Sequence, residues 1–366
     1  MKVQMVDLKG QYEAIKSEID QAIQDVIDDG RFINGPAVHS FSSKLAKWNV
    51  SKYVIPCANG TDGLQIALMA LGLKGGDEVI VPAFTYIATV EVLVLLGLKP
   101  IFVDVEEATF ELNLEDASSK VTSKTRAIMP VHLYGQCSEM SKILDFSNEH
   151  ELFIVEDIAQ AIGSTYEGKK AGNFGDLGVT SFFPSKNLGC YGDGGAIFCN
   201  DEDLAMKAKQ VANHGQSQKY VHDIVGVNSR LDSIQASILS AKLEHLDTYI
   251  AARRAAARHY DNALKSLDWL TPPAKILGST HVYHQYTLKI KNGQRDQLKN
   301  YLQENGIPSM IYYPMAIPDQ KPYRKFAVGR YPIAQRLCNE VISLPMHTEL
   351  SIEQLNYITD KIVNFG

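Results

Sequence analysis

The chain has 366 residues, 45% of them hydrophobic and 21% charged, and a formal net charge of -6. This composition is typical of a globular protein, excludes disordered and fibrous classes, and at this length allows one large domain and one smaller one. An acidic balance without a stripe of lysine and arginine gives no electrostatic footprint for DNA or RNA, so we expect no nucleic-acid partner.

The sequence also disfavours membrane and disulfide-rich classes. The N-terminus is charged from its second residue, and the most apolar stretch, 92–98, is too short to cross a bilayer. The five cysteines are odd in number and show no paired ligand spacing, which predicts neither a disulfide framework nor a metal site. We therefore expect reduced thiols, no membrane partner and a cytoplasmic location.

In chain order, the first predicted element is an amphipathic helix from Ile15 to Ile27, closed by Gly30. From residue 53 to the run FIVEDI, short apolar runs alternate with helical segments, which predicts a mostly parallel sheet covered by helices on both faces. After about residue 246, a long helix rich in Ala and Arg is followed by short strands and a further helix, typical of a smaller α+β domain. We therefore divide the chain into 1–250 and 251–366.

Ligands of parallel sheets bind outside the carboxyl ends of the strands. Four segments follow predicted strands in this way, namely 58–61, 82–86, 157–160 and 181–186. We expect them to converge on one crevice.

Two of these segments carry a lysine and an aspartate that suggest covalent chemistry. Lys186 stands between an apolar run and a glycine cluster, and Asp157 ends an apolar strand. Lysine amines form Schiff bases with carbonyl compounds, and a buried carboxylate can keep the ring nitrogen of a pyridoxal cofactor protonated. The pair therefore indicates a pyridoxal site; the alternative is a surface lysine and a helix-capping aspartate.

The other candidates are individually weaker. Gly60 and Thr61 open a helix after a strand and suit a phosphate, although Thr61 could be a plain N-cap; Ser181 could add a second hydroxyl. Tyr86 could lie against a flat ring or be a rim aromatic. Gln160, one helical turn past the aspartate, could approach the ring from its other side or hydrogen-bond its hydroxyl.

A polar turn before the helix SIQASILSAKLEHL carries Asn228 and Arg230. The arginine fork could bind a carboxylate or phosphate, and the alternative is a solvated helix start. The glycines at 192, 194 and 195 do not form a GxGxxG that opens a helix, which disfavours a nicotinamide oxidoreductase.

Taken in order, the motifs ANGTDGLQIAL, PAFTY, EDIAQAIG, TSFFPSKNLGCYGDGGAIF, ANHG and GVNSRLDSIQA resemble the DegT/DnrJ/EryC/StrS sugar aminotransferases over nearly the whole chain. These are fold type I enzymes that depend on pyridoxal 5′-phosphate. The resemblance implies an α/β large domain with a mostly parallel seven-stranded sheet and a smaller C-terminal α+β domain. It extends to the members that act on UDP-2-acetamido-2-deoxy-3-keto-glucuronic acid.

The resemblance also implies roles for the candidate residues. Lys186 would hold the cofactor covalently and shuttle protons, and Asp157 would pair with its ring nitrogen. Gly60, Thr61 and Ser181 would bind the cofactor phosphate, and Tyr86 and Gln160 would contact its ring. Asn228 would reach the cofactor phosphate of the neighbouring subunit. The last contact implies a homodimer with shared active sites.

The implied reaction is the transfer of an amino group from L-glutamate to the C3 ketone of that UDP-sugar, for surface polysaccharide synthesis. Arg230, Tyr312 and Tyr313 are the expected substrate contacts. Tyr312 replaces the family's usual histidine and Ala316 its usual proline, which keeps a 4-keto or 3-keto-6-deoxy nucleotide sugar open. A non-catalytic cofactor-binding regulator is another alternative, and a pyridoxal-dependent dehydratase is disfavoured because such relatives replace the lysine with histidine.

Overall fold

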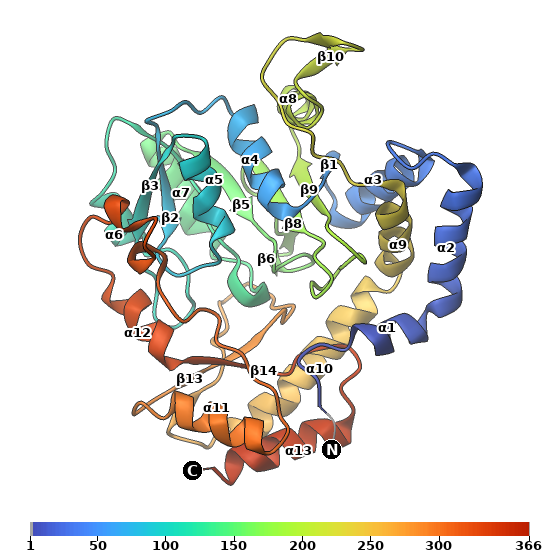
Figure 1. Cartoon of the computed structure of the whole chain (residues 1–366). Helices are drawn as coiled ribbons and strands as arrows, with labels where there is room; N and C mark the ends of the chain where they lie inside the picture. The colour runs from blue at the N-terminus through green and yellow to red at the C-terminus, as the bar shows by residue number, and fades with distance from the viewer. Residues whose placement is uncertain (1–2, 366) are drawn as a thin grey trace.

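The computed structural model describes residues 3–365, with a seven-stranded sheet at the centre (Figure 1). In spatial order its strands are β1 (Tyr53–Cys57), β9 (Gly195–Cys199), β8 (Leu177–Ser181), β5 (Phe153–Asp157), β4 (Thr125–Ile128), β2 (Glu78–Pro82) and β3 (Lys99–Val103). Pairing is parallel from β8 through β5, β4 and β2 to β3, whereas β9 runs antiparallel to both β1 and β8. This confirms the predicted mostly parallel sheet.

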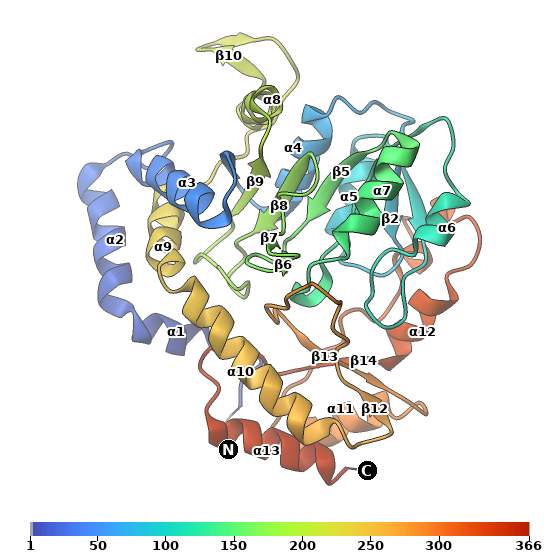
Figure 2. The same cartoon turned by 180° about the vertical axis from the view of Figure 1, so that it is seen from behind.

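Helices cover both faces of this sheet (Figures 1 and 2). One apolar cluster lies between the sheet and α4 (Gly60–Ala70), α5 (Ala88–Leu95) and α8 (Glu202–Ala212). A second lies between the opposite face and α3 (Pro36–Asn49), α7 (Met140–His150) and α9 (Ser233–Leu243). Strands covered on both faces read as continuous apolar runs, as EVIVP in β2 does, because neither face meets water.

The predicted N-terminal helix is present as α2 (Lys16–Asp29), preceded by α1 (Leu8–Ala14). Ile19 and Val26 are its buried residues, two turns apart on one face, and Ile19 packs against Ile238 of α9. Gly30 ends the helix at φ 70°, a left-handed conformation that glycine adopts at little cost.

The C-terminal part has its own apolar cluster around a three-stranded antiparallel sheet, which Val3 of the N-terminal segment joins. The predicted division at residue 250 falls inside the long helix α10, which runs from the large sheet into this cluster (Figure 2). The elements of this part are α10 (Leu246–Leu264), β12 (Leu270–Thr271), β13 (Tyr286–Ile290), α11 (Arg295–Glu304), α12 (Pro332–Glu340), β14 (Val341–Leu344) and α13 (Ile352–Val363).

One C-terminal segment returns to the large sheet. Asp104, just past β3, accepts the backbone N–H groups of Ile333 and Ala334 at 2.9 and 2.8 Å and so caps the first turn of α12. Ala316 and Ile317 are buried in the same apolar cluster as α4 and α5. The segment that carries Tyr312 and Tyr313 is therefore held beside the sheet.

Short elements complete the chain, and the hairpin of β10 and β11 extends away from the body after α8 (Figure 1). Within residues 3–365 no helix combines the length and apolar character needed to span a bilayer. The short elements are α6 (Leu114–Ser118), the 3-10 turns η1 (Leu133–Gly135), η2 (Ile317–Asp319) and η3 (Arg324–Phe326), and the strands β6 (Thr165–Tyr166), β7 (Lys169–Lys170), β10 (Gln216–Gln218) and β11 (Val221–His222).

Candidate active site

The four segments predicted to converge do so at the carboxyl edge of the sheet. Residues 58–61 come directly after β1. The segments 82–86, 157–160 and 181–186 begin with the last residue of β2, β5 and β8, respectively. β1 and β8 end at the same edge because both pair with the start of the antiparallel strand β9, at Gly195.

Asp157 ends the central strand β5 and is 6% exposed. Its Oδ2 accepts a hydrogen bond from the Thr89 hydroxyl at 2.9 Å, and its Oδ1 accepts one from the Ala159 backbone N–H at 3.1 Å. Burial raises the pKa of Asp157, while these hydrogen bonds and the charge of Lys186 act in the opposite direction. A carboxylate in this position is stabilised by a cationic partner that excludes water.

Lys186 lies in the loop after β8, where its backbone N–H donates to the Phe183 carbonyl at 2.8 Å. Burial lowers the pKa of Lys186 to about 8, and the Asp157 carboxylate acts in the opposite direction. The amine is therefore uncharged in a larger fraction of molecules near neutral pH than an exposed lysine is, which is the state that attacks a carbonyl carbon.

The first turn of α4 and Ser181 form a cradle for an anion. The Asn59 carboxamide caps α4 by accepting the Asp62 N–H at 2.8 Å, so Thr61 is not the N-cap and its hydroxyl stands in the first turn. A Cβ on Gly60 would lie 2.9 Å from the Ser181 Cβ, so only glycine allows this approach. The free N–H groups of the helix start and the Ser181 hydroxyl thus lie together, as a phosphate requires.

Gln160, Tyr86 and Tyr313 surround the space next to Asp157. The Gln160 Oε1 accepts the Tyr134 backbone N–H at 2.8 Å, and its Nε2 donates to the Tyr313 hydroxyl at 3.1 Å. The Tyr86 side chain is 54% exposed, and its ring centroid is 6.0 Å from that of Tyr313. Gln160 is thereby fixed in orientation, and Tyr86 offers an uncovered ring face.

Tyr312 lies beside the same group, because the Tyr134 hydroxyl donates to the Tyr312 carbonyl. The two tyrosines expected to contact the substrate are therefore next to the expected cofactor contacts, although they come from the C-terminal part of the chain.

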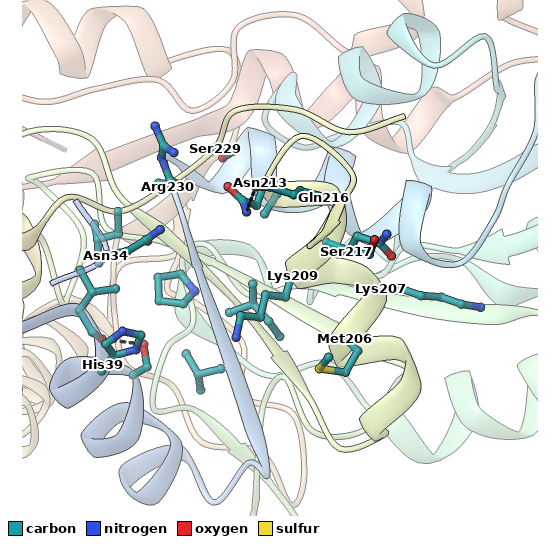
Figure 3. Close-up of a pocket in the computed structure, with 18 of the residues that line it drawn as sticks. Asn34, His39, Met206, Lys207, Lys209, Asn213, Gln216, Ser217, Ser229 and Arg230 are labelled. Atoms are coloured by element: carbon teal, nitrogen blue, oxygen red, sulfur yellow. Dashed lines mark hydrogen bonds between the residues drawn. The ribbon is translucent and has the colours of Figure 1, made fainter. Parts of the chain in front are cut away.

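Asn228 and Arg230 lie on a different surface of the same chain. Asn228 is exposed and forms an isolated β-bridge with Asn213. Arg230 lines a cavity of about 790 Å³ between α3, β1, α8 and β10 (Figure 3). Neither Lys186 nor Asp157 lines this cavity. Between Asn228 and Arg230, the Ser229 hydroxyl accepts the Ala58 backbone N–H at 2.9 Å. The turn formed by residues 228–230 therefore contacts the chain immediately before Asn59, which caps α4.

Sequence reasoning missed three neighbours of the site. Thr89 bonds Asp157 from α5, Tyr134 orients Gln160 from the turn after β4, and His284 lies near enough to Lys186 for the lysine charge to affect its pKa. None lies in a local motif, and Thr89 is simply a polar residue in a mostly apolar helix. Only the position of Tyr134, in the turn after a predicted strand, could have indicated it.

These residues fit pyridoxal 5′-phosphate. A lysine of lowered pKa and a buried carboxylate affect each other's pKa, the first turn of α4 with Thr61 packs against Ser181, and the exposed ring of Tyr86 lies beside Tyr313. Fold and site together define a pyridoxal phosphate-dependent enzyme of the α/β class.

Comparison with known proteins identifies the family. The sequence model of the DegT/DnrJ/EryC1/StrS aminotransferase family matches residues 13–363, and the chain belongs to this family. The protein is accordingly a pyridoxal phosphate-dependent sugar aminotransferase.

Among its relatives, the UDP-2-acetamido-2-deoxy-3-oxo-D-glucuronate aminotransferase of Pseudomonas aeruginosa is 42% identical over 99% of this chain and 100% of its own length. A pleiotropic regulatory protein of Geobacillus stearothermophilus is also 42% identical, over 100% of this chain and 99% of its own. The crystal structure of a family aminotransferase from Brucella abortus matches with a TM-score of 0.95 and 40% identity over 99% of both chains.

Proposed function

We propose that this enzyme transfers an amino group from L-glutamate to the C3 ketone of UDP-2-acetamido-2-deoxy-3-keto-glucuronic acid, in the cytoplasm, for surface polysaccharide synthesis. The observation that carries the proposal is the full-length similarity to the Pseudomonas aeruginosa aminotransferase. The cavity that Arg230 lines has four cationic side chains and no carboxylate among the described residues, which suits the diphosphate that any nucleotide sugar carries.

When bound, pyridoxal 5′-phosphate would supply an electrophilic carbonyl and a ring that withdraws electrons. Lys186 would hold it covalently, and the Lys186 amine, once free, would carry the proton that moves during the transfer. Asp157 would keep the ring nitrogen protonated, and the α4 start with Thr61 and Ser181 would hold the phosphate. Gln160 and Tyr86 would contact the ring.

The decisive experiment incubates the enzyme with L-glutamate and a panel of keto sugars and follows 2-oxoglutarate. The 3-keto glucuronic acid derivative should turn over fastest, and a Lys186→Ala variant should give no product with any sugar. Turnover of 4-keto sugars alone would reject the proposed substrate.

A second candidate substrate is a 4-keto or 3-keto-6-deoxy nucleotide sugar. Relatives named for dTDP-linked and GDP-linked sugars also match over most of the chain, and Tyr312 and Ala316 depart from the usual family residues. The same panel separates these substrates. Cofactor binding without turnover of any sugar or donor would instead favour a regulatory role, the description carried by one relative.

We further propose that the enzyme is a homodimer in which Asn228 and Arg230 serve the partner's active site. The hairpin beside them and the segment that follows it expose apolar side chains, with Tyr220 at 81% and Val225 at 84%, which is unusual for a surface that stays in water. The Tyr86 ring, next to the candidate active site, is also exposed, and a partner subunit would cover it.

Mixing two inactive variants tests this arrangement. Lys186→Ala removes the amine, and Asn228→Asp places a carboxylate against the proposed phosphate of the partner. After equal amounts are dissociated and reassociated together, half of the dimers are mixed and each has one intact site, so about a quarter of wild-type activity should return. No recovery in a verified mixed dimer would refute shared sites, and activity of Asn228→Asp alone would refute the phosphate contact.

A further inference from the structure

Lys242 is a buried lysine that the mechanism above does not use. It lies on α9 and is 1% exposed, and it forms no ion pair with a carboxylate among the described residues. Its Nζ donates to the Gly189 carbonyl at 2.6 Å and lies 4.7 Å from the centre of the Tyr191 ring. Both contacts lie in the segment 182–191, the lysine loop, which carries Lys186. A buried ammonium without a carboxylate is costly, so these two contacts indicate a role in holding the lysine loop.

The lysine loop closes on itself. Its ends meet where the Cys190 N–H donates to the Phe182 carbonyl at 2.8 Å. Between these ends, a Cβ on Gly189 would lie only 2.3 Å from the Pro184 carbonyl oxygen, so the returning chain packs tightly against the outgoing chain. A side chain that holds Gly189 therefore holds the loop as a unit, Lys186 included.

A second buried side chain ties the lysine loop to the C-terminal part of the chain. Asn187, next to the lysine, is 4% exposed and donates its Nδ2 amide to the Val282 carbonyl at 2.9 Å. Val282 in turn donates its N–H to the Gly135 carbonyl at 2.7 Å. Gly135 is itself held closely, because at φ 108° a Cβ on it would lie 3.0 Å from the Gln160 carbonyl oxygen. The Asn187 amide therefore joins the lysine loop to the residues around Gln160.

These two ties matter because Lys186 stands on a loop. Loops move more than the helices and strands that they join unless bonds to the body of the protein restrain them. An amine that transfers protons needs a fixed position, since a displacement of about 1 Å can cost about 100-fold in rate. The bonds made by Asn187 and Lys242 come from two separate parts of the fold, and both side chains are buried, so they act on the loop and not on a substrate.

We propose that Asn187 and Lys242 are positioning residues for Lys186. Their hydrogen bonds hold the lysine loop between α9 and the C-terminal part of the chain, and the Lys186 amine thereby stays where the proposed proton transfer requires it. Neither residue gains or loses a proton in the reaction. This inference rests on the proposed role of Lys186 and not on which sugar or donor is used.

Removal of the Asn187 amide is the first test. Asn187→Ala deletes the bond to Val282 and leaves only a small gap. Asn173→Ala is the matched control, because Asn173 is also buried and donates its amide to a backbone carbonyl, that of Asn49, at 2.9 Å. Asn173 makes no hydrogen bond to the lysine loop among the described residues.

Removal of the Lys242 amine is the second test. Lys242→Met deletes the amine at similar volume, and Lys170→Met is its control, because Lys170 donates to the Trp48 carbonyl and lies 3.3 Å from the centre of the Trp48 ring. Burial lowers the pKa of Lys242 to about 8, so its charge costs free energy in the folded state. Lys242→Met should therefore unfold at no lower urea concentration than the wild type at pH 7, and any loss of rate in it is not a loss of folding.

The apoenzyme gives a readout that needs neither cofactor nor substrate. Hydrogen exchange followed by mass spectrometry reports how often the lysine loop opens, because amides such as that of Cys190 are bonded within it. Asn187→Ala and Lys242→Met should each exchange the peptide 182–191 about 10-fold faster than the wild type, the effect of one lost buried hydrogen bond. Both controls should exchange it at the wild-type rate. Wild-type exchange in either test variant would overturn the inference.

A single-turnover reaction with L-glutamate, protonated or deuterated at C2, measures the proton-transfer step. Both test variants should slow the deuterium-sensitive step about 10-fold and leave the glutamate concentration at half-maximal rate unchanged, because a buried positioning residue does not contact the substrate. An equal loss of rate in the two controls would reduce the effect to general destabilisation and overturn the inference. Turnover by Lys186→Ala would refute the role of Lys186 itself, and a wild type inert to glutamate would refute only that donor.

Discussion

Thr89→Val removes one of the two hydrogen bonds that hold the Asp157 carboxylate ionised. The lost bond is 2.9 Å long, buried, and made to a charged acceptor, a class worth about 1.5–3 kcal/mol. At about 1.4 kcal/mol for each tenfold change in proton affinity, the pKa of Asp157 should rise by about one to two. Burial already raises this pKa, so the Ala159 N–H and the charge of Lys186 would be left to oppose it. The valine has nearly the same shape, so packing changes little.

The assay is the pH profile of the glutamate half-reaction. If Asp157 acts as proposed, it must be ionised to keep the ring nitrogen protonated. The acid limb of the profile should then move to higher pH in Thr89→Val, by about one to two pH units. Thr85→Val is the matched control, since Thr85 is 3% exposed but its hydroxyl has no partner among the described residues. An acid limb at the same pH in Thr89→Val and wild type would refute the reasoning, and so would an equal shift in Thr85→Val.

Two further predictions concern the apoenzyme and the phosphate cradle. The pKa of Lys186 falls from 10.5 to about 8 on folding, so the lysine destabilises the apoenzyme below pH 8 and ceases to do so above pH 10.5. In urea unfolding at pH 7, the free energy of unfolding of apo Lys186→Met should therefore exceed that of the wild type by up to about 3 kcal/mol. The difference should shrink progressively between pH 8 and 10.5. Cofactor-free wild type as stable as the variant at pH 7 would contradict this. Gly60→Ala should weaken cofactor binding at least about 10-fold in equilibrium titration, because its Cβ would lie 2.9 Å from the Ser181 Cβ. Gly75→Ala should bind the cofactor normally, because its Cβ would lie 3.8 Å from the Gly97 carbonyl oxygen, an ordinary contact distance. Equal affinities would show that the cradle tolerates a methyl group.

Much of the large sheet could be predicted because its strands are short apolar runs that alternate with helices, and each strand end carries a polar segment. That pattern placed Asp157 and Lys186 at one edge, since parallel strands covered on both faces leave only their carboxyl ends open. The N-terminal helix was recoverable for a similar reason, because Ile19 and Val26 repeat on one face before a glycine.

The contacts between distant segments could not be predicted in this way. Thr89 reaches Asp157 across 68 positions of sequence, and the Gln160 amide reaches Tyr313 across 153. Such pairs depend on how helices and loops pack on the sheet, which no local period encodes. The division of the chain at residue 250 stays a prediction; the structure shows only that α10 is continuous across it.

The catalytic pair illustrates why both levels are needed. The sequence indicates that a lysine and an aspartate meet, and from this alone an ion pair with a charged lysine would be expected. The environment weakens that pair: burial is the larger influence on both groups, since it lowers the pKa of Lys186 to about 8 and raises that of Asp157, and their mutual attraction is the smaller one. Each group is therefore less satisfied in the apoenzyme than it would be in water. In the proposed site, the cofactor carbonyl would bind the amine and its ring nitrogen would pair with the carboxylate, which would relieve both conditions at once. Part of the binding free energy of the cofactor would then be the free energy that burying these two side chains costs on folding.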